Sequence, residues 1–122
     1  ADEVAGIIGH EVAHASLRHA SKLYREFIGI LSQRDKGTVS DATLLLFNCH
    51  LEEFEQDADI TGVLYAQKAG FNPHGLPDFL ERHLNSMIQN GVFGLLRFSA
   101  ITNISSRINH MRDYISSLAI KE

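Results

Sequence analysis

The sequence predicts a mainly α-helical bundle that forms a single domain over residues 1–122. Apolar residues recur every three or four positions through most of the chain, which is the periodicity of helices that bury one face. Polar segments that contain Gly or Pro separate these stretches, and no segment has the pattern of a strand-bearing sheet. With 44% hydrophobic residues, the chain can bury one core without disulfides.

The first part of the chain predicts two helices with a break near Arg18. The first helix has its apolar positions at Val4, Ile7, Ile8, Val12 and Ala15. The second segment runs from Ala20 to about Gln33 and carries apolar residues at helical spacing, namely Leu23, Phe27, Ile30 and Leu31. Residues 34–40 are polar and contain a glycine, so we expect a loop there.

A long helix is predicted from about Asp41 to Ala69, with Ser40 or Asp41 as its N-terminal cap. Gly70 is expected to end this helix, and Pro73 prevents a simple continuation.

Another amphipathic helix is predicted from Gly75 to Asn90 and is ended by Gly91. Its buried stripe is expected to consist of Leu76, Phe79, Leu80, Leu84, Met87 and Ile88. The mixed pattern from Val92 to Asn103 favours an irregular segment, and a last helix is predicted from about Ile104 to Ala119.

The segment His10-Glu11-Val12-Ala13-His14 carries the strongest chemical signal. A four-residue step on a helix turns the side chain by about 40°, so both imidazoles leave the same face. Glu11 stands three residues before His14 and overhangs the same place. Imidazole nitrogen is a good zinc ligand, and a carboxylate outside the inner shell is free to accept a proton from water. The pattern predicts a zinc site, and its alternative is an amphipathic helix that happens to carry two histidines.

A third ligand is expected from the acidic segment 51–59, because catalytic zinc sites use three protein ligands and leave one position open. Glu55 and Asp59 are four residues apart and share one helix face. This spacing suits a division in which one carboxylate binds metal and the other orients a ligand imidazole. The remaining acidic residues are expected on the solvated face of the helix, namely Glu52, Glu53 and Asp57.

These motifs resemble the gluzincin metallopeptidases, and the flanking residues look like the HtpX-like and Oma-like branch, which is related to the Ste-type CAAX proteases. The matching stretches follow the family's order and spacing over most of the chain: residues 5–14, 18–19, 55–59 with Gly62, 69–73 and 79–82. The resemblance implies a zincin catalytic core with one zinc ion per chain. It implies that His10, His14 and Glu55 are the zinc ligands, that Glu11 is the general base, and that Asp59 holds the ring of His10.

One part of the family pattern is missing. The family usually carries a His-Pro pair six residues before an Arg-Ile pair, whereas this chain has Arg107-Ile108 preceded by Ile101-Thr102. In the family this loop lies near the metal, so we expect the missing histidine to affect either full catalytic activity or a regulatory contact. Candidates for stabilising the transition state are Arg107, His110 and Tyr114, with Tyr65 as an alternative donor.

The resemblance implies a zinc metalloendopeptidase that cleaves protein or peptide substrates, in protein quality control at the cell envelope, periplasmic or membrane-associated. Family members carry a strand-bearing part, and often a signal or membrane anchor, before the active-site helix. We therefore expect the chain to be a fragment that lacks this upstream part and cleaves weakly by itself. The alternative is a zinc-binding regulatory or catalytically impaired peptidase-like module. A di-iron carboxylate bundle would need a second Glu-x-x-His pattern, which the sequence does not contain.

Composition excludes other partner classes. The net charge is −4 and the 11 Lys and Arg residues are scattered, so nucleic acid is not an expected partner. No apolar run approaches the roughly 20 residues that a transmembrane helix needs. The oligomeric state stays open.

Cys49 is expected to be a buried small hydrophobe. The histidines outside the motif are expected on helix surfaces or in loops: His19, His50, His74, His83 and His110.

Overall fold

The computed structural model describes the backbone of residues 1–32, 41–90 and 95–119, and every regular element in these ranges is a helix. The five helices are α1 (Asp2–Ser16), α2 (His19–Ser32), α3 (Asp41–Lys68), α4 (Gly75–Gln89) and α5 (Leu95–Ala119). The mainly α-helical fold class is therefore confirmed. The predicted features at Gln33, Ser40, Gly91 and residues 92–94 lie outside the described residues.

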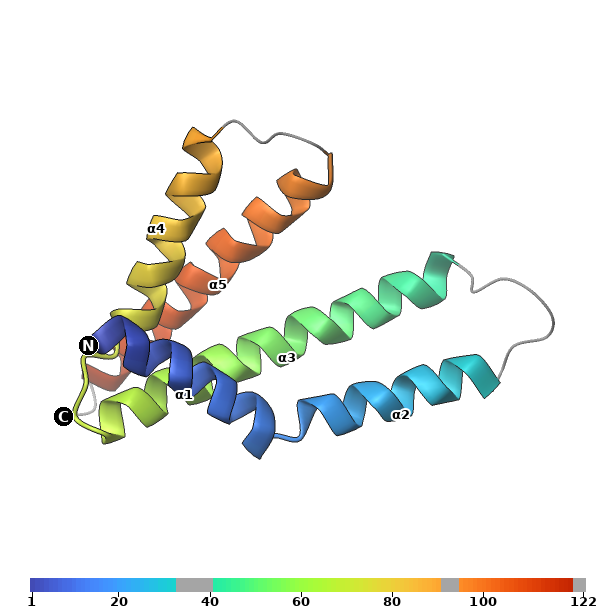
Figure 1. The fold of residues 1–122 in the computed structure, drawn as a ribbon, viewed down its shortest axis with the longest axis horizontal. Helices are drawn as coiled ribbons and strands as arrows, with labels where there is room; N and C mark the ends of the chain where they lie inside the picture. Colours follow the sequence, from blue (N-terminus) through green and yellow to red (C-terminus); the bar gives the residue numbers. More distant parts are fainter. Residues whose placement is uncertain (33–40, 91–94, 120–122) are drawn as a thin grey trace.

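Figure 1 shows two helical pairs that diverge from a shared base. One pair consists of α2 and the N-terminal half of α3, and the other consists of α4 and α5. At the base, α1 lies across the C-terminal half of α3 and also contacts α4. No helix within the described ranges is long and apolar enough to cross a membrane.

Two predicted helix ends are confirmed by unusual backbone angles. Arg18 has a φ of 57° in the turn between α1 and α2, a backbone conformation that residues other than glycine seldom adopt. Gly70 has a φ of 85° after α3. The amide of Gly70 donates to the carbonyl of Gln67 and the amide of Phe71 donates to that of Ala66, both at 3.0 Å. This pair of hydrogen bonds is the Schellman ending that glycine favours.

The predicted irregular segment from Val92 to Asn103 is wrong over residues 95–103, because α5 begins at Leu95. These residues include no Gly or Pro, and several of them favour helix on their own. They lack only a clear apolar stripe. A weak periodicity therefore hid a helix that needs no continuous stripe to form.

The buried face of α1 differs from the predicted one. Of its five predicted apolar positions, Ile7 packs against the core, whereas Val4, Ile8 and Val12 are 58%, 57% and 50% exposed. Ala15 is exposed as well. The residues that α1 buries are small, namely Gly6, Gly9 and Ala13. The apolar stripe instead lines an open groove together with Tyr65, Ala69 and Phe71.

The core lies where α1, α3, α4 and α5 meet. Its buried residues are Val63, Leu76, Met111 and Ile115, with Ile7, Ile60, Leu80 and Tyr114 packed around them. Most of the predicted α4 stripe is at least partly buried, but Ile88 is exposed. It lies near the end of α4, far from the shared base.

The prediction that Cys49 is buried is wrong, because its side chain is exposed. Phe27, a predicted apolar position of α2, is also exposed. Both residues belong to the pair formed by α2 and the N-terminal half of α3, which leaves the base and lies apart from α4 and α5 (Figure 1). A helical pair without a third covering layer cannot bury all of its apolar residues.

Glycines set the distance between α1 and α3. A Cβ atom added at Gly9 would lie 2.6 Å from the carbonyl oxygen of Gly62, and one added at Gly62 would lie 2.6 Å from the amide nitrogen of His10. Both obstacles are backbone atoms, which cannot rotate away. The two helices therefore cross at a separation that side chains larger than hydrogen do not allow.

We expect Gly9→Ala to lower the free energy of unfolding by about 1–3 kcal/mol, since the added methyl group forces the two backbones apart. The matched control is Gly29→Ala in α2, where an added Cβ meets nothing within 4 Å. This control should be neutral or stabilising by up to about 1 kcal/mol. Urea unfolding followed by circular dichroism measures both, and a Gly9→Ala variant as stable as the control would contradict the close crossing.

Candidate metal centre

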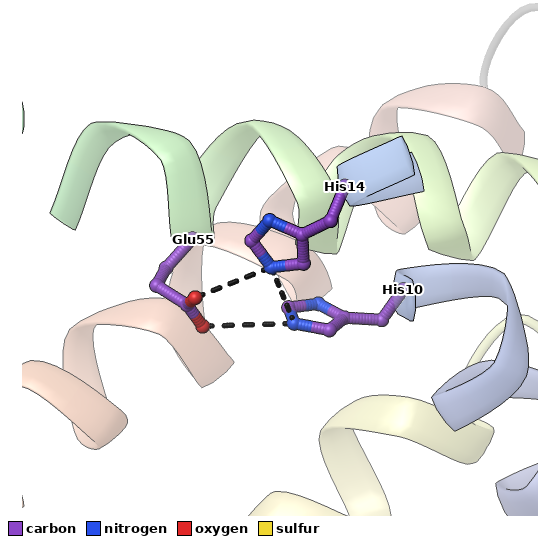
Figure 2. A group of neighbouring side chains, drawn as sticks. All are labelled: His10, His14 and Glu55. Atoms are coloured by element: carbon purple, nitrogen blue, oxygen red, sulfur yellow. Dashed lines mark hydrogen bonds and ion pairs between the residues drawn. The ribbon is translucent and has the colours of Figure 1, made fainter. Parts of the chain in front are cut away.

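Three potential metal ligands converge between α1 and α3. His10 and His14 come from successive turns of α1, and Glu55 comes from α3 (Figure 2). The Nε2 atoms of the two histidines are 3.0 Å apart. Oε1 of Glu55 lies 3.2 Å from Nε2 of His14, and Oε2 lies 3.6 Å from Nε2 of His10. We call these three residues the ligand cluster.

The ligand cluster fits a zinc ion. Two atoms that each bind one tetrahedral zinc at about 2.0–2.1 Å lie about 3.3 Å from each other. The three separations in the structure, 3.0, 3.2 and 3.6 Å, bracket this value, the last two being to different oxygens of Glu55. Two imidazole nitrogens and one carboxylate form a donor set that zinc accepts. Glu55 is 37% exposed, so one side of the cluster is open, as a catalytic site requires.

Asp59 supports His10 from the side away from the cluster. Its carboxylate is fully buried, and its Oδ1 atom lies 2.9 Å from Nδ1 of His10, a close contact without the alignment of a hydrogen bond. Burial raises the pKa of Asp59, but contacts from Arg107 and His10 outweigh burial and hold this pKa below its ordinary value. Asp59 is therefore an anion that favours a proton on Nδ1 of His10 and leaves Nε2 facing the cluster.

Arg107 of α5 binds both carboxylates at the centre. Its Nε and one terminal nitrogen donate to the two oxygens of Asp59 at 2.7 and 2.8 Å, and the other terminal nitrogen lies 2.9 Å from Oε2 of Glu55. Burial lowers the pKa of Arg107, but Asp59 and Glu55 outweigh burial, so that this pKa lies above its ordinary value. The guanidinium group, predicted as a transition-state stabiliser, is occupied by these carboxylates in the structure.

An open hollow lies beside the ligand cluster, between α1, α2 and α3. It is lined by His10, Glu11, His14, Ala15, His19, Ala20, Leu23 and Glu55. Glu11 is exposed, and it lines the same hollow as the three residues of the ligand cluster. Glu52, Glu53 and Asp57 are exposed, as the sequence predicted for them.

The other predicted donors are placed elsewhere. His110 is exposed on α5, and Tyr114 packs against the core. The hydroxyl of Tyr65 lies 3.1 Å from Oγ of Ser16. None of these three residues is among those that line the hollow. The side chains of Ile101 and Thr102 lie outside the described residues, although their backbone belongs to α5.

His19 is the site residue that sequence reasoning missed. We predicted a surface or loop residue, but its side chain is 2% exposed, and its Nδ1 lies 2.9 Å from Nδ1 of His14. Burial, followed by the nearby His14 and Lys22, lowers the pKa of His19. The helix break at Arg18 hid this contact, because helical spacing cannot be continued from His14 across a turn. The predicted break was nevertheless a signal, because it indicated that the helix axis changes direction just before His19.

Comparison with known proteins gives one distant relative. The chain is similar to the β-barrel assembly-enhancing protease of Yersinia pestis, with 25% identity over 101 residues that cover 66% of this chain and 21% of that protein. The chain thus spans about a fifth of the length of this relative. No family model matches the chain, and no solved structure matches it significantly. The similarity is partial and weak, and the protein that it connects to this chain is a protease.

Proposed function

We propose that this chain is the catalytic core of a zinc-dependent endopeptidase. The observation that carries the proposal is the convergence of His10, His14 and Glu55 at separations that fit one zinc ion. The distant similarity to a protease supports peptide hydrolysis as the reaction. Protein substrates in the cell envelope, and a role in quality control there, are part of the same proposal.

Glu11 is the proposed general base. It is exposed at the hollow and forms none of the ion pairs found within the described residues. Its carboxylate is therefore available to the water molecule that attacks the substrate. A bound zinc ion supplies Lewis acidity, which makes water more acidic and polarises the substrate carbonyl. Glu11 takes the proton of the attacking water and passes it to the nitrogen of the departing amine.

Asp59 and Arg107 are the proposed supports of this arrangement. Asp59 favours the tautomer of His10 whose Nε2 lone pair faces the cluster. Arg107 compensates the charge of Asp59 and restrains Glu55. In this role Arg107 acts on the ligands and their neighbours, whereas the oxyanion role predicted for it would require its guanidinium to leave them.

The second candidate function is a zinc-binding regulatory or catalytically impaired module. The ion pairs of Arg107 favour it, because a guanidinium group bound to Asp59 and Glu55 is not free to stabilise the transition state of hydrolysis. Such a module would bind zinc with the same residues but would not hydrolyse peptides. Metal binding and proteolysis must therefore be measured separately.

The purified chain should bind one zinc ion, measured by elemental analysis after loading and removal of free metal. Glu55→Gln should lose most of this zinc, because a neutral amide is a poor replacement for a carboxylate ligand. Glu52→Gln is the matched control, since Glu52 lies on the same helix and is exposed. Wild-type chain without zinc, or equal zinc in both variants, would remove the basis of the proposal.

Glu11→Gln should keep its zinc and lose cleavage of casein, because the change removes the base but no ligand. Glu53→Gln, exposed on α3, should retain wild-type cleavage, and a zinc chelator should stop it. Loss of zinc in Glu11→Gln would show that the carboxylate roles are assigned incorrectly. A zinc-loaded wild type that cleaves nothing, alone or with the rest of any longer protein, would favour the regulatory module.

Asp59→Asn should weaken zinc affinity by about 10–100-fold, because the amide orients His10 less well and leaves Arg107 without its main partner. Asp57→Asn is the control, as Asp57 is exposed two residues earlier in α3. Competition with a chromogenic chelator measures both affinities. Unchanged affinity in Asp59→Asn would mean that His10 needs no support from this carboxylate.

A further inference from the structure

A buried histidine stands behind the ligand His14. His19 is the first residue of α2, and its side chain is almost completely buried. Its Nδ1 lies 2.9 Å from Nδ1 of His14, whereas Nε2 of His14 faces His10 and Glu55. The two nitrogens of the His14 ring therefore contact different groups, the ligand cluster on one side and His19 on the other.

The chemistry of imidazole decides which ring donates. A ligand must offer the lone pair of its metal-facing nitrogen, so His14 carries its proton on Nδ1 when Nε2 binds metal. At 2.9 Å, Nδ1 of His19 must then accept that proton in a hydrogen bond. In this arrangement the proton of the His19 ring lies on Nε2, which is buried and has no hydrogen-bond partner among the described residues. A second proton at the short contact would place two donors against each other.

Packing fixes the ring of His19 for this contact. Its ring stacks on that of Phe54, with centroids 4.5 Å apart and planes 19° apart. Phe54 precedes Glu55 in α3, and the turn at Arg18 brings the start of α2 to this place. The stacked pair therefore joins α2 to the part of α3 that supplies the third ligand.

We propose that His19 is a positioning residue of the metal centre, which accepts a hydrogen bond from Nδ1 of His14 and so holds the Nε2 atom of that ring toward the metal. This inference rests on the proposed metal centre. His19 would orient the ring of His14 as Asp59 is proposed to orient that of His10, but with a neutral group in place of a charged one.

Two kinds of substitution separate this role from simple core packing. His19→Phe keeps an aromatic ring of similar size against Phe54 but removes the acceptor. His19→Asn loses the stacking but places an amide oxygen near the former position of Nδ1. His19→Gln places its amide nearer to the former position of Nε2, away from His14. Packing and hydrogen bonding thus change in different variants.

The test measures zinc affinity of the whole chain by chelator competition, with thermal unfolding of the metal-free forms beside it. His19→Phe should bind zinc about 10–100-fold more weakly while it keeps near-wild-type stability without metal. His19→Asn should restore affinity to within a few-fold of the wild type despite lower stability. His19→Gln should remain weak. His83→Phe is the control, because His83 also stacks on a phenylalanine, Phe79, but is exposed on α4.

Wild-type affinity in His19→Phe would overturn the inference, and so would equal affinities of His19→Asn and His19→Gln. The comparison of these two amides also decides the matter if His19→Phe does not fold. A wild-type chain that binds no zinc would overturn the metal centre and this inference together. Failure of His19 alone leaves zinc binding by the wild type intact, so the two failures are distinguishable.

Discussion

The close crossing of α1 and α3 at Gly9 and Gly62 is the constraint on which the candidate metal centre depends. His10 follows Gly9 directly, and Glu55 and Asp59 lie within two turns before Gly62. An added Cβ at either glycine would meet backbone atoms at 2.6 Å, so the two helices are in close contact at this point. This short separation lets the histidines of α1 reach the carboxylates of α3. The exposed stripe of Val4, Ile8 and Val12 follows from the same constraint, since a helix that turns its small residues inward turns its large ones outward.

Charge compensation is the second requirement of the centre. A buried, unpaired carboxylate costs several kcal/mol, so Asp59 can remain ionised only because Arg107 binds both of its oxygens. Arg107 comes from α5, the most distant element in the chain. The contacts behind the proposed ligand His10 therefore pass through α3 to α5, so that the helical pair α4 and α5 contributes Arg107 to the candidate site.

Helical spacing predicted much of the fold and the shared face of His10 and His14, because residues four apart share a face in any helix. The choice of Glu55 as the residue that joins them was implied by the resemblance to the gluzincins. What helical spacing missed depends on contacts between helices. The sequence cannot show that α1 buries glycine and alanine in place of valine and isoleucine, since both faces have helical periodicity. Likewise, His19 lies beyond a turn, and only the direction of α2 after Arg18 brings its ring to His14.

The groups behind the two proposed ligand histidines differ in charge, and the surroundings explain the difference. Behind His10, the anion Asp59 is matched by Arg107. Behind His14 lies the ring of His19, at 2.9 Å, and a carboxylate in its place would add a second negative charge close to Glu55. In the proposed arrangement, the neutral imidazole of His19 orients the ring of His14 and adds no charge. The formal charges of Glu55, Asp59 and Arg107 leave a single negative charge at the centre, which a divalent cation more than balances.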